Sequence, residues 1–114
     1  MTNIWTAQYR YAGTDRLDVT VKGNDQIGHI FAPTWKMVMD YKSGKGGEQA
    51  YIANYRTLLK GRQPDVSNSV EWIYNQEQIT LVCFCPAGTF CHRVILAKWL
   101  SGNPNCNYIG ERRL

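Results

Sequence analysis

The alternation of hydrophobic and polar positions predicts four strands. Leu17–Val21 alternates strictly between apolar and polar side chains, the pattern of a strand with one buried face. Ile4–Tyr11 is rich in aromatic and β-branched residues and predicts another strand. Gln78–Cys85 holds a near-continuous apolar run, which predicts a central strand covered on both faces. Asn107–Ile109 predicts a short last strand.

Apolar residues recur at helical spacing in four other segments. One helix opens at Pro33-Thr34 and ends before Ser43, and a second runs from about Glu48 to Lys60. A third begins near Asp65 or Ser67 and continues through Ile73, and a fourth is Cys91–Leu100. The tryptophans on these helices are expected in the core: Trp35, Trp72 and Trp99.

The resulting order of elements is β β α α α β α β. Helices separate the strong strands, which favours an α/β fold with a Rossmann-like parallel or mixed sheet and helices on both faces. The 114 residues are the usual size of one domain, so we expect a single α/β domain over residues 1–114.

Composition excludes several classes of protein. The hydrophobic fraction of 44% and charged fraction of 19% exclude a disordered or coiled-coil chain. No apolar run approaches the ~18–20 residues that span a bilayer, and residues 1–11 do not resemble a secretory signal. We therefore expect no membrane partner, a cytoplasmic protein and four reduced cysteines.

The net charge of +4 is spread along the chain. A nucleic-acid binder usually has a denser basic stripe, so the charge pattern argues against a nucleic-acid partner. The alternative to a merely solubilising excess is that a few cations converge on one small anion. The candidate contacts to this anion, besides the main site below, are Arg10, Lys22, Arg56 and Arg112.

The segment from Cys83 to Arg93 carries the most chemical information, because it reads as a strand end, a glycine-containing loop and a helix start. Ligands in open α/β sheets bind beyond the carboxyl ends of strands, and a helix N-terminus favours anions. A cation in the first helical turn conflicts with the helix dipole. We expect Arg93 to resolve this conflict by binding a phosphate together with the amides of Gly88–Cys91, Thr89 among them. A structural carboxylate such as Glu111 is the alternative.

Two further types of chemistry use the same residues. Cys91 at a helix N-terminus beside Arg93 is a candidate nucleophile, with His92 or Glu111 as acid or base. However, phosphatase and rhodanese loops place the cysteine at the strand end, and the interval from Cys85 to Arg93 is longer than the phosphatase spacing. For a metal, four soft ligands are available: Cys83, Cys85, Cys91 and His92. Their spacing matches no recognised zinc pattern, so we expect no metal and no cofactor.

Tyr51 and Tyr55 share one helical face. Either both rings pack on the sheet, or they line the pocket and contact a base or ribose.

The apolar strand Ile79–Cys85 followed by Cys91-His92-Arg93 resembles the YeaO-like domain-of-unknown-function family, DUF488. Residues 31–35 with Tyr51 and Tyr55, and residues 17–22, are similar to other parts of its pattern. The resemblance implies a Rossmann-like fold and a pocket near Cys91, His92, Arg93 and the tyrosines. It implies no reaction. Compact members of this family occur in bacteria and bacteriophages.

These observations predict a protein that binds a phosphorylated, nucleotide-like small molecule. If the chain is phage-encoded, this binding would sequester a nucleotide signal. One alternative is a hydrolase or transferase acting on a nucleoside or nucleotide. Another is a protein-interaction module with an exposed tyrosine patch. A homo-oligomer is compatible with each of these.

Overall fold

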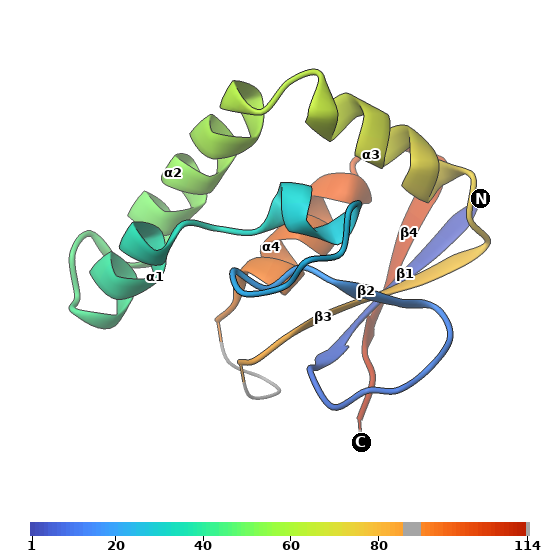
Figure 1. The fold of residues 1–114 in the computed structure, drawn as a ribbon, viewed down its shortest axis with the longest axis horizontal. Coiled ribbons are helices and arrows are strands. Elements are labelled where there is room, and N and C mark those ends of the chain that lie inside the picture. Colours follow the sequence, from blue (N-terminus) through green and yellow to red (C-terminus); the bar gives the residue numbers. More distant parts are fainter. Residues whose placement is uncertain (86–89, 114) are drawn as a thin grey trace.

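A computed structural model describes residues 1–85 and 90–113 and contains a four-stranded, all-parallel sheet. The strand order is β2-β3-β1-β4, as Figure 1 shows. This confirms the α/β fold and the parallel sheet that the sequence predicts. The strands are β1 (Thr2–Gln8), β2 (Arg16–Asp18), β3 (Gln78–Cys83) and β4 (Cys106–Glu111).

The predicted order of strands and helices is also confirmed, with one short 3₁₀ helix, η1, in addition. Thr34 begins α1 as its N-cap, because its side chain accepts a hydrogen bond from the Met37 amide. The helices are η1 (Gly28–Phe31), α1 (Trp35–Lys42), α2 (Gly47–Gly61), α3 (Asp65–Tyr74) and α4 (His92–Leu100). No helix in residues 1–85 and 90–113 is long and apolar enough to cross a membrane.

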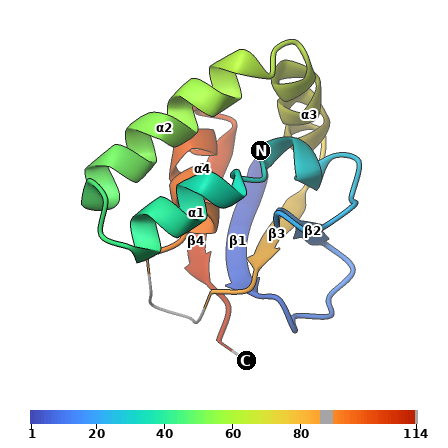
Figure 2. The same ribbon diagram turned by 60° about the vertical axis from the view of Figure 1, so that its left-hand side comes forward.

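The helices gather on one side of the sheet, and the prediction of helices on both faces is wrong (Figures 1 and 2). The reason is the direction in which the chain crosses the sheet. The β2–β3 and β3–β4 connections carry the helices and move the same way along the strand order, whereas β1–β2 moves back over β3. Right-handed crossovers put the first two connections on one face and the third on the other.

The β1–β2 connection therefore covers the second face with polar and aromatic groups instead of a helix. The Asp15 carboxylate accepts hydrogen bonds from Thr80, Tyr11 and Gln78 on this face. The Arg112 guanidinium pairs with Asp15 and lies 4.3 Å from the centre of the Trp5 ring. These contacts bury Thr80 completely although no helix packs on it.

The hydrophobic core lies between the sheet and the helices. Ile4 and Ile79, which are partners in the β1–β3 register, face Leu96 and Leu100 of α4. The predicted burial of the helical tryptophans is wrong: each is at least two-fifths exposed, because other residues form the packed helix faces. Those packed residues are Met37 in α1, Val66 and Ile73 in α3, and Leu96, Ala97 and Leu100 in α4.

Candidate functional site

A β-bulge in β4 decides which side of the sheet two side chains of the site face. The register with β1 shifts between Ile4, opposite Tyr108, and Trp5, opposite Gly110. Because of this shift, Tyr108 and Glu111 both lie on the helix-covered side, although residues three apart in a regular strand face opposite sides. Gly110 has φ of +147°, a conformation that is essentially restricted to glycine.

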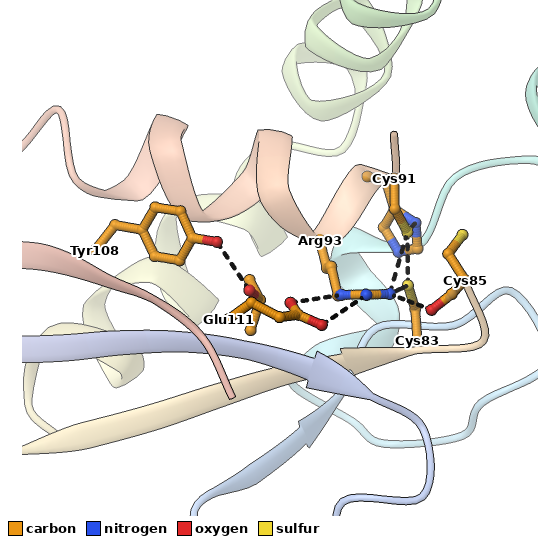
Figure 3. A network of polar contacts seen from close by, with 8 residues as sticks. Cys83, Cys85, Cys91, Arg93, Tyr108 and Glu111 are labelled. Atoms are coloured by element: carbon orange, nitrogen blue, oxygen red, sulfur yellow. Dashed lines mark hydrogen bonds and ion pairs between the residues drawn. The ribbon is translucent and has the colours of Figure 1, made fainter. Parts of the chain in front are cut away.

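Arg93, in the first turn of α4, is the centre of a polar network (Figure 3). Its side chain is 1% exposed and makes a two-point ion pair with Glu111, with Nη2–Oε2 at 2.9 Å and Nε–Oε1 at 3.3 Å. The opposite edge of the guanidinium faces the end of β3: Nη1 lies 2.9 Å from Cys83 Sγ and donates to the Cys85 carbonyl. The internal carboxylate, the alternative raised by the sequence, is therefore the partner that the structure gives Arg93.

Three thiols converge beside this guanidinium, and we call Cys83, Cys85 and Cys91 the thiol cluster. Their sulfur atoms all lie within 4.8 Å of one another, with Cys83 and Cys91 at 2.6 Å. Cys83 is the last residue of β3 and Cys91 is the N-cap of α4, so a strand and a helix hold them in place. Cys83 and Cys91 are buried, whereas Cys85 is partly exposed.

The contacts of Cys83 favour its thiolate form. Hydrogen bonds from Cys85 and Cys91, aided by the charge of Arg93, hold the pKa of Cys83 far below its ordinary value. The same hydrogen bonds to Cys83 raise the pKa of Cys91 and of Cys85, because each of these thiols must keep its proton to donate it. Of the three thiols, Cys83 is therefore the one whose surroundings favour the thiolate. The sequence places a cysteine at the strand end, but its spacing alone does not show that Arg93 reaches that sulfur.

His92 contacts the thiol cluster from the side of β2. Its Nε2 lies 2.7 Å from the Val19 carbonyl oxygen, and its Nδ1 lies 3.7 Å from Cys91 Sγ. A carbonyl only accepts hydrogen bonds, so Nε2 carries the proton and Nδ1 presents its lone pair to Cys91. Burial lowers the pKa of His92, which keeps the ring neutral.

A cavity of about 610 Å³ opens above the thiol cluster, at the carboxyl ends of the strands. Its walls come mainly from aromatic and aliphatic side chains of α1, α2 and the segments after β2 and β3. Tyr41 and Phe90 pack against Tyr51, with ring centres 5.9 and 5.4 Å away. Lys22 and Lys42 add two cations. The wall also contains residues for which the sequence predicts no place in a pocket: Thr20, Val21, Pro33, Trp35, Val38, Tyr41, Lys42, Phe84 and Phe90.

The two predicted tyrosines have different positions. Tyr51 lines the cavity, and burial raises its pKa, so its hydroxyl stays neutral. Tyr55 is buried, and its hydroxyl donates to the Phe31 carbonyl, which joins α2 to η1. Tyr55 instead borders a second, smaller cavity of about 330 Å³ between α2 and α4. Of the two alternatives that the sequence leaves open for the tyrosines, packing in the core therefore describes Tyr55.

The predicted anion contacts are dispersed. Lys22 borders the main cavity, where its ammonium lies 5.6 Å from the centre of the Trp35 ring. Arg56 lines the second cavity, and Arg112 lies on the other face of the sheet, paired with Asp15. Arg10 is exposed and borders neither cavity. Gly88 and Thr89 lie outside the described residues.

The thiol cluster is also the group that has the donor atoms for a metal ion. Three cysteine sulfur atoms suit a soft metal. Within residues 1–85 and 90–113 this group comprises the three cysteines and not His92, whose Nδ1 lies 3.7 Å from Cys91 Sγ. The guanidinium of Arg93 lies against one of the three sulfur atoms, which disfavours a second cation at that position.

Comparison with known proteins gives one family. The model of the DUF488-N3a family, described as the active DUF488-N3 subclade, matches residues 1–103. This range includes the whole thiol cluster and Arg93 but ends before Glu111. No curated protein and no solved structure matches the chain.

Proposed function

The chain belongs to the DUF488 family, and we propose that it is a cysteine-dependent enzyme that acts on a nucleotide-like, anionic small molecule. Its reaction class would be group transfer or hydrolysis with Cys83 as the nucleophile. The description of the matched subclade as active agrees with a reactive centre in this chain.

One observation carries the proposal: the sulfur of Cys83, surrounded by three hydrogen-bond donors that favour its thiolate, lines the floor of an aromatic cavity. Arg93, Cys85 and Cys91 all donate to Cys83. The thiolate, not the thiol, is the nucleophile in cysteine chemistry. A buried guanidinium fixed by Glu111 cannot move away to water, so the negative charge on Cys83 is maintained before any substrate arrives.

The cavity walls indicate the class of ligand. The aromatic rings of Tyr41, Tyr51 and Phe90 offer flat surfaces on which a base-like ring can stack. Lys22 and Lys42 are placed to attract an anionic group such as a phosphate. Arg93 in this proposal acts on Cys83 and not on the phosphate, because Glu111 already occupies its outer edge.

The residues suggest a covalent route. The Cys83 sulfur would attack an electrophilic centre of the ligand, and the bond to the leaving group would break with its electron pair. The group bound to Cys83 would then be transferred to water or to an acceptor molecule, which frees the Cys83 thiolate. During this step Cys83 loses its charge, and Arg93 remains paired with Glu111.

A second candidate function is binding of the same ligand class without turnover. Cys83 is only 1% exposed, and the cavity alone has the volume of a small-molecule site. In this case the protein would sequester the ligand.

Substrate trapping separates the two candidates. The wild-type chain and Cys83→Ser would be purified from cells and analysed by native mass spectrometry, with Cys106→Ser as the matched control. Cys106 is a buried free cysteine on β4 and does not line either cavity. We expect Cys83→Ser to retain an intact nucleotide-like molecule, while wild type and Cys106→Ser carry product, an adduct or nothing.

Equal recovery of the intact molecule from all three proteins would exclude turnover and favour sequestration. If no chain retains a ligand, and no nucleotide raises the melting temperature of Cys83→Ser, both candidates are wrong.

A further inference from the structure

The arrangement of Cys83, Cys91 and His92 points to a two-thiol reaction. We propose that Cys91 resolves the adduct formed on Cys83 by making a Cys83–Cys91 disulfide, and that the group donor is therefore a disulfide or persulfide. This inference rests on the proposed function, because it requires Cys83 to be the nucleophile.

Cys83 and Cys91 lie close enough to react with each other without a rearrangement of the fold. Cys83 and Cys91 are eight residues apart in sequence, yet their sulfur atoms lie within 2.6 Å. The two residues belong to different rigid elements, the end of β3 and the start of α4. The bond between them can therefore form with no movement of the sheet or the helix. Cys85 is the most exposed of the three thiols and lies at the cavity wall.

One guanidinium contacts both sulfur atoms. Arg93 Nη1 lies 2.9 Å from Cys83 Sγ and 3.7 Å from Cys91 Sγ. While Cys83 is a thiolate, a second negative charge on Cys91 would be repelled. Once Cys83 carries an adduct it is neutral, and the charge of Arg93 then stabilises a thiolate on Cys91. The order of the two attacks follows from this competition: Cys83 first, Cys91 second.

His92 is placed to act as the base of the second step. His92 Nδ1 faces Cys91 Sγ at 3.7 Å, and its lone pair is directed there because Nε2–H donates to Val19. Cys91 can therefore give its proton to His92 as it becomes a nucleophile. The nucleophilic-cysteine reading of the sequence gives Cys91 the first attack; the contacts of Arg93 assign that attack to Cys83.

The Cys83 thiolate attacks one sulfur of a disulfide R–S–S–R′; a Cys83–S–R bond forms, and R′–S⁻ leaves with the electron pair. Cys91 passes its proton to His92 and attacks the Cys83 sulfur, and R–S⁻ leaves and takes the proton from His92. The substrate is reduced to two thiols, and the enzyme is oxidised to the Cys83–Cys91 disulfide. A cellular dithiol or two monothiol molecules would reduce the enzyme again.

An aromatic, anionic disulfide fits the chemistry of the cavity, and dithiobis(nitrobenzoate) is such a probe with a coloured leaving group. The reaction would be followed in a Cys85→Ser/Cys106→Ser background, in which residue 85 keeps a hydroxyl that can donate to Cys83. We expect about two equivalents of coloured thiolate per chain and no bound probe, because Cys91 expels the second half. Peptide mass spectrometry would locate a Cys83–Cys91 disulfide.

Adding Cys91→Ser to this background should stop the reaction after about one equivalent and leave the other half of the probe bound to Cys83. His92→Gln should slow the second release but not the first, and raising the pH should restore the second release. These two variants separate resolution from initial attack.

Three results would overturn the inference: a stable adduct on Cys83 while Cys91 is present, identical kinetics with and without Cys91, or a soft metal ion held by the three thiols of the purified wild-type chain. A different result, in which Cys83 reacts in none of the proteins, would reject the proposed function itself. The first release therefore tests Cys83, and the second tests Cys91.

Discussion

At the scale of single residues, Arg93 and its contacts set the properties of the site. The guanidinium of Arg93 is 99% buried, so its desolvation costs free energy. Glu111 offsets this cost with a two-point ion pair. The opposite edge of the same group stabilises the Cys83 thiolate. The sequence indicates the two possible partners of Arg93, a ligand or Glu111, because a cation in the first helical turn needs an anion. It cannot choose between them, since Glu111 is 18 residues away and reaches Arg93 only through the fold.

The Arg93–Glu111 pair predicts a large effect from one conservative substitution. Glu111→Gln keeps the shape but removes the negative charge beside a buried guanidinium, so the free energy of unfolding should fall by about 3–5 kcal/mol. Urea denaturation measures this loss. Asp40→Asn, in an exposed pair with Lys36, is the control and should change stability little. A loss for Glu111→Gln no larger than that of the control would show that the pair does not stabilise the fold.

At the scale of elements, the bulge in β4 decides where Glu111 points. The short apolar segment 107–109 correctly predicts a strand, but alternation along a regular strand would put Tyr108 and Glu111 on opposite faces. The register shift at Gly110 puts both on the helix side. A bulge leaves little trace in a short hydrophobic pattern, and for that reason this part of the site is not predictable from the sequence. The exposure of Trp35 is likewise not predictable from the sequence, because helical spacing identifies an apolar helix face but not the element that packs against it.

Gly110→Ala tests the role of the bulge. Nothing lies within 4 Å of an added Cβ, so the cost comes from the backbone conformation and should be about 1–3 kcal/mol. Gly61→Ala, at the end of α2, is the matched control, because its Cβ also meets open space and its φ is not positive. We expect Gly61→Ala to be neutral or slightly stabilising. Equal behaviour of the two variants in thermal or urea unfolding would contradict the assignment.

At the scale of the whole molecule, the direction of each crossover places the site. Two right-handed helical connections put the helices on one face, and the carboxyl ends of β2 and β3 meet beneath the cavity. The sequence predicts the order of elements and the position of the site at a strand end, since both follow from local patterns. It does not predict the single helical layer, because the strand order, on which the layer depends, is set by contacts that are distant in the chain.

The burial of His92 beneath this layer predicts how stability depends on pH. Its folded pKa lies below the ordinary 6.5, so below about pH 6.5 the unfolded chain binds a proton that the folded chain does not. Stability should therefore fall as the pH decreases from 6.5 toward the folded pKa, by at most about 1.4 kcal/mol per pH unit from this group. Urea unfolding at a series of pH values measures the slope. His92→Gln should flatten it.

The most direct test of the whole account is a pH titration of thiolate absorbance in the wild-type chain, Cys83→Ser and Cys106→Ser. We expect one thiolate per chain already at about pH 6, present in wild type and Cys106→Ser and lost in Cys83→Ser. Absorbance that rises only near pH 9, the ordinary value for a cysteine, would contradict it. So would a thiolate at about pH 6 that persists when Cys83 is replaced.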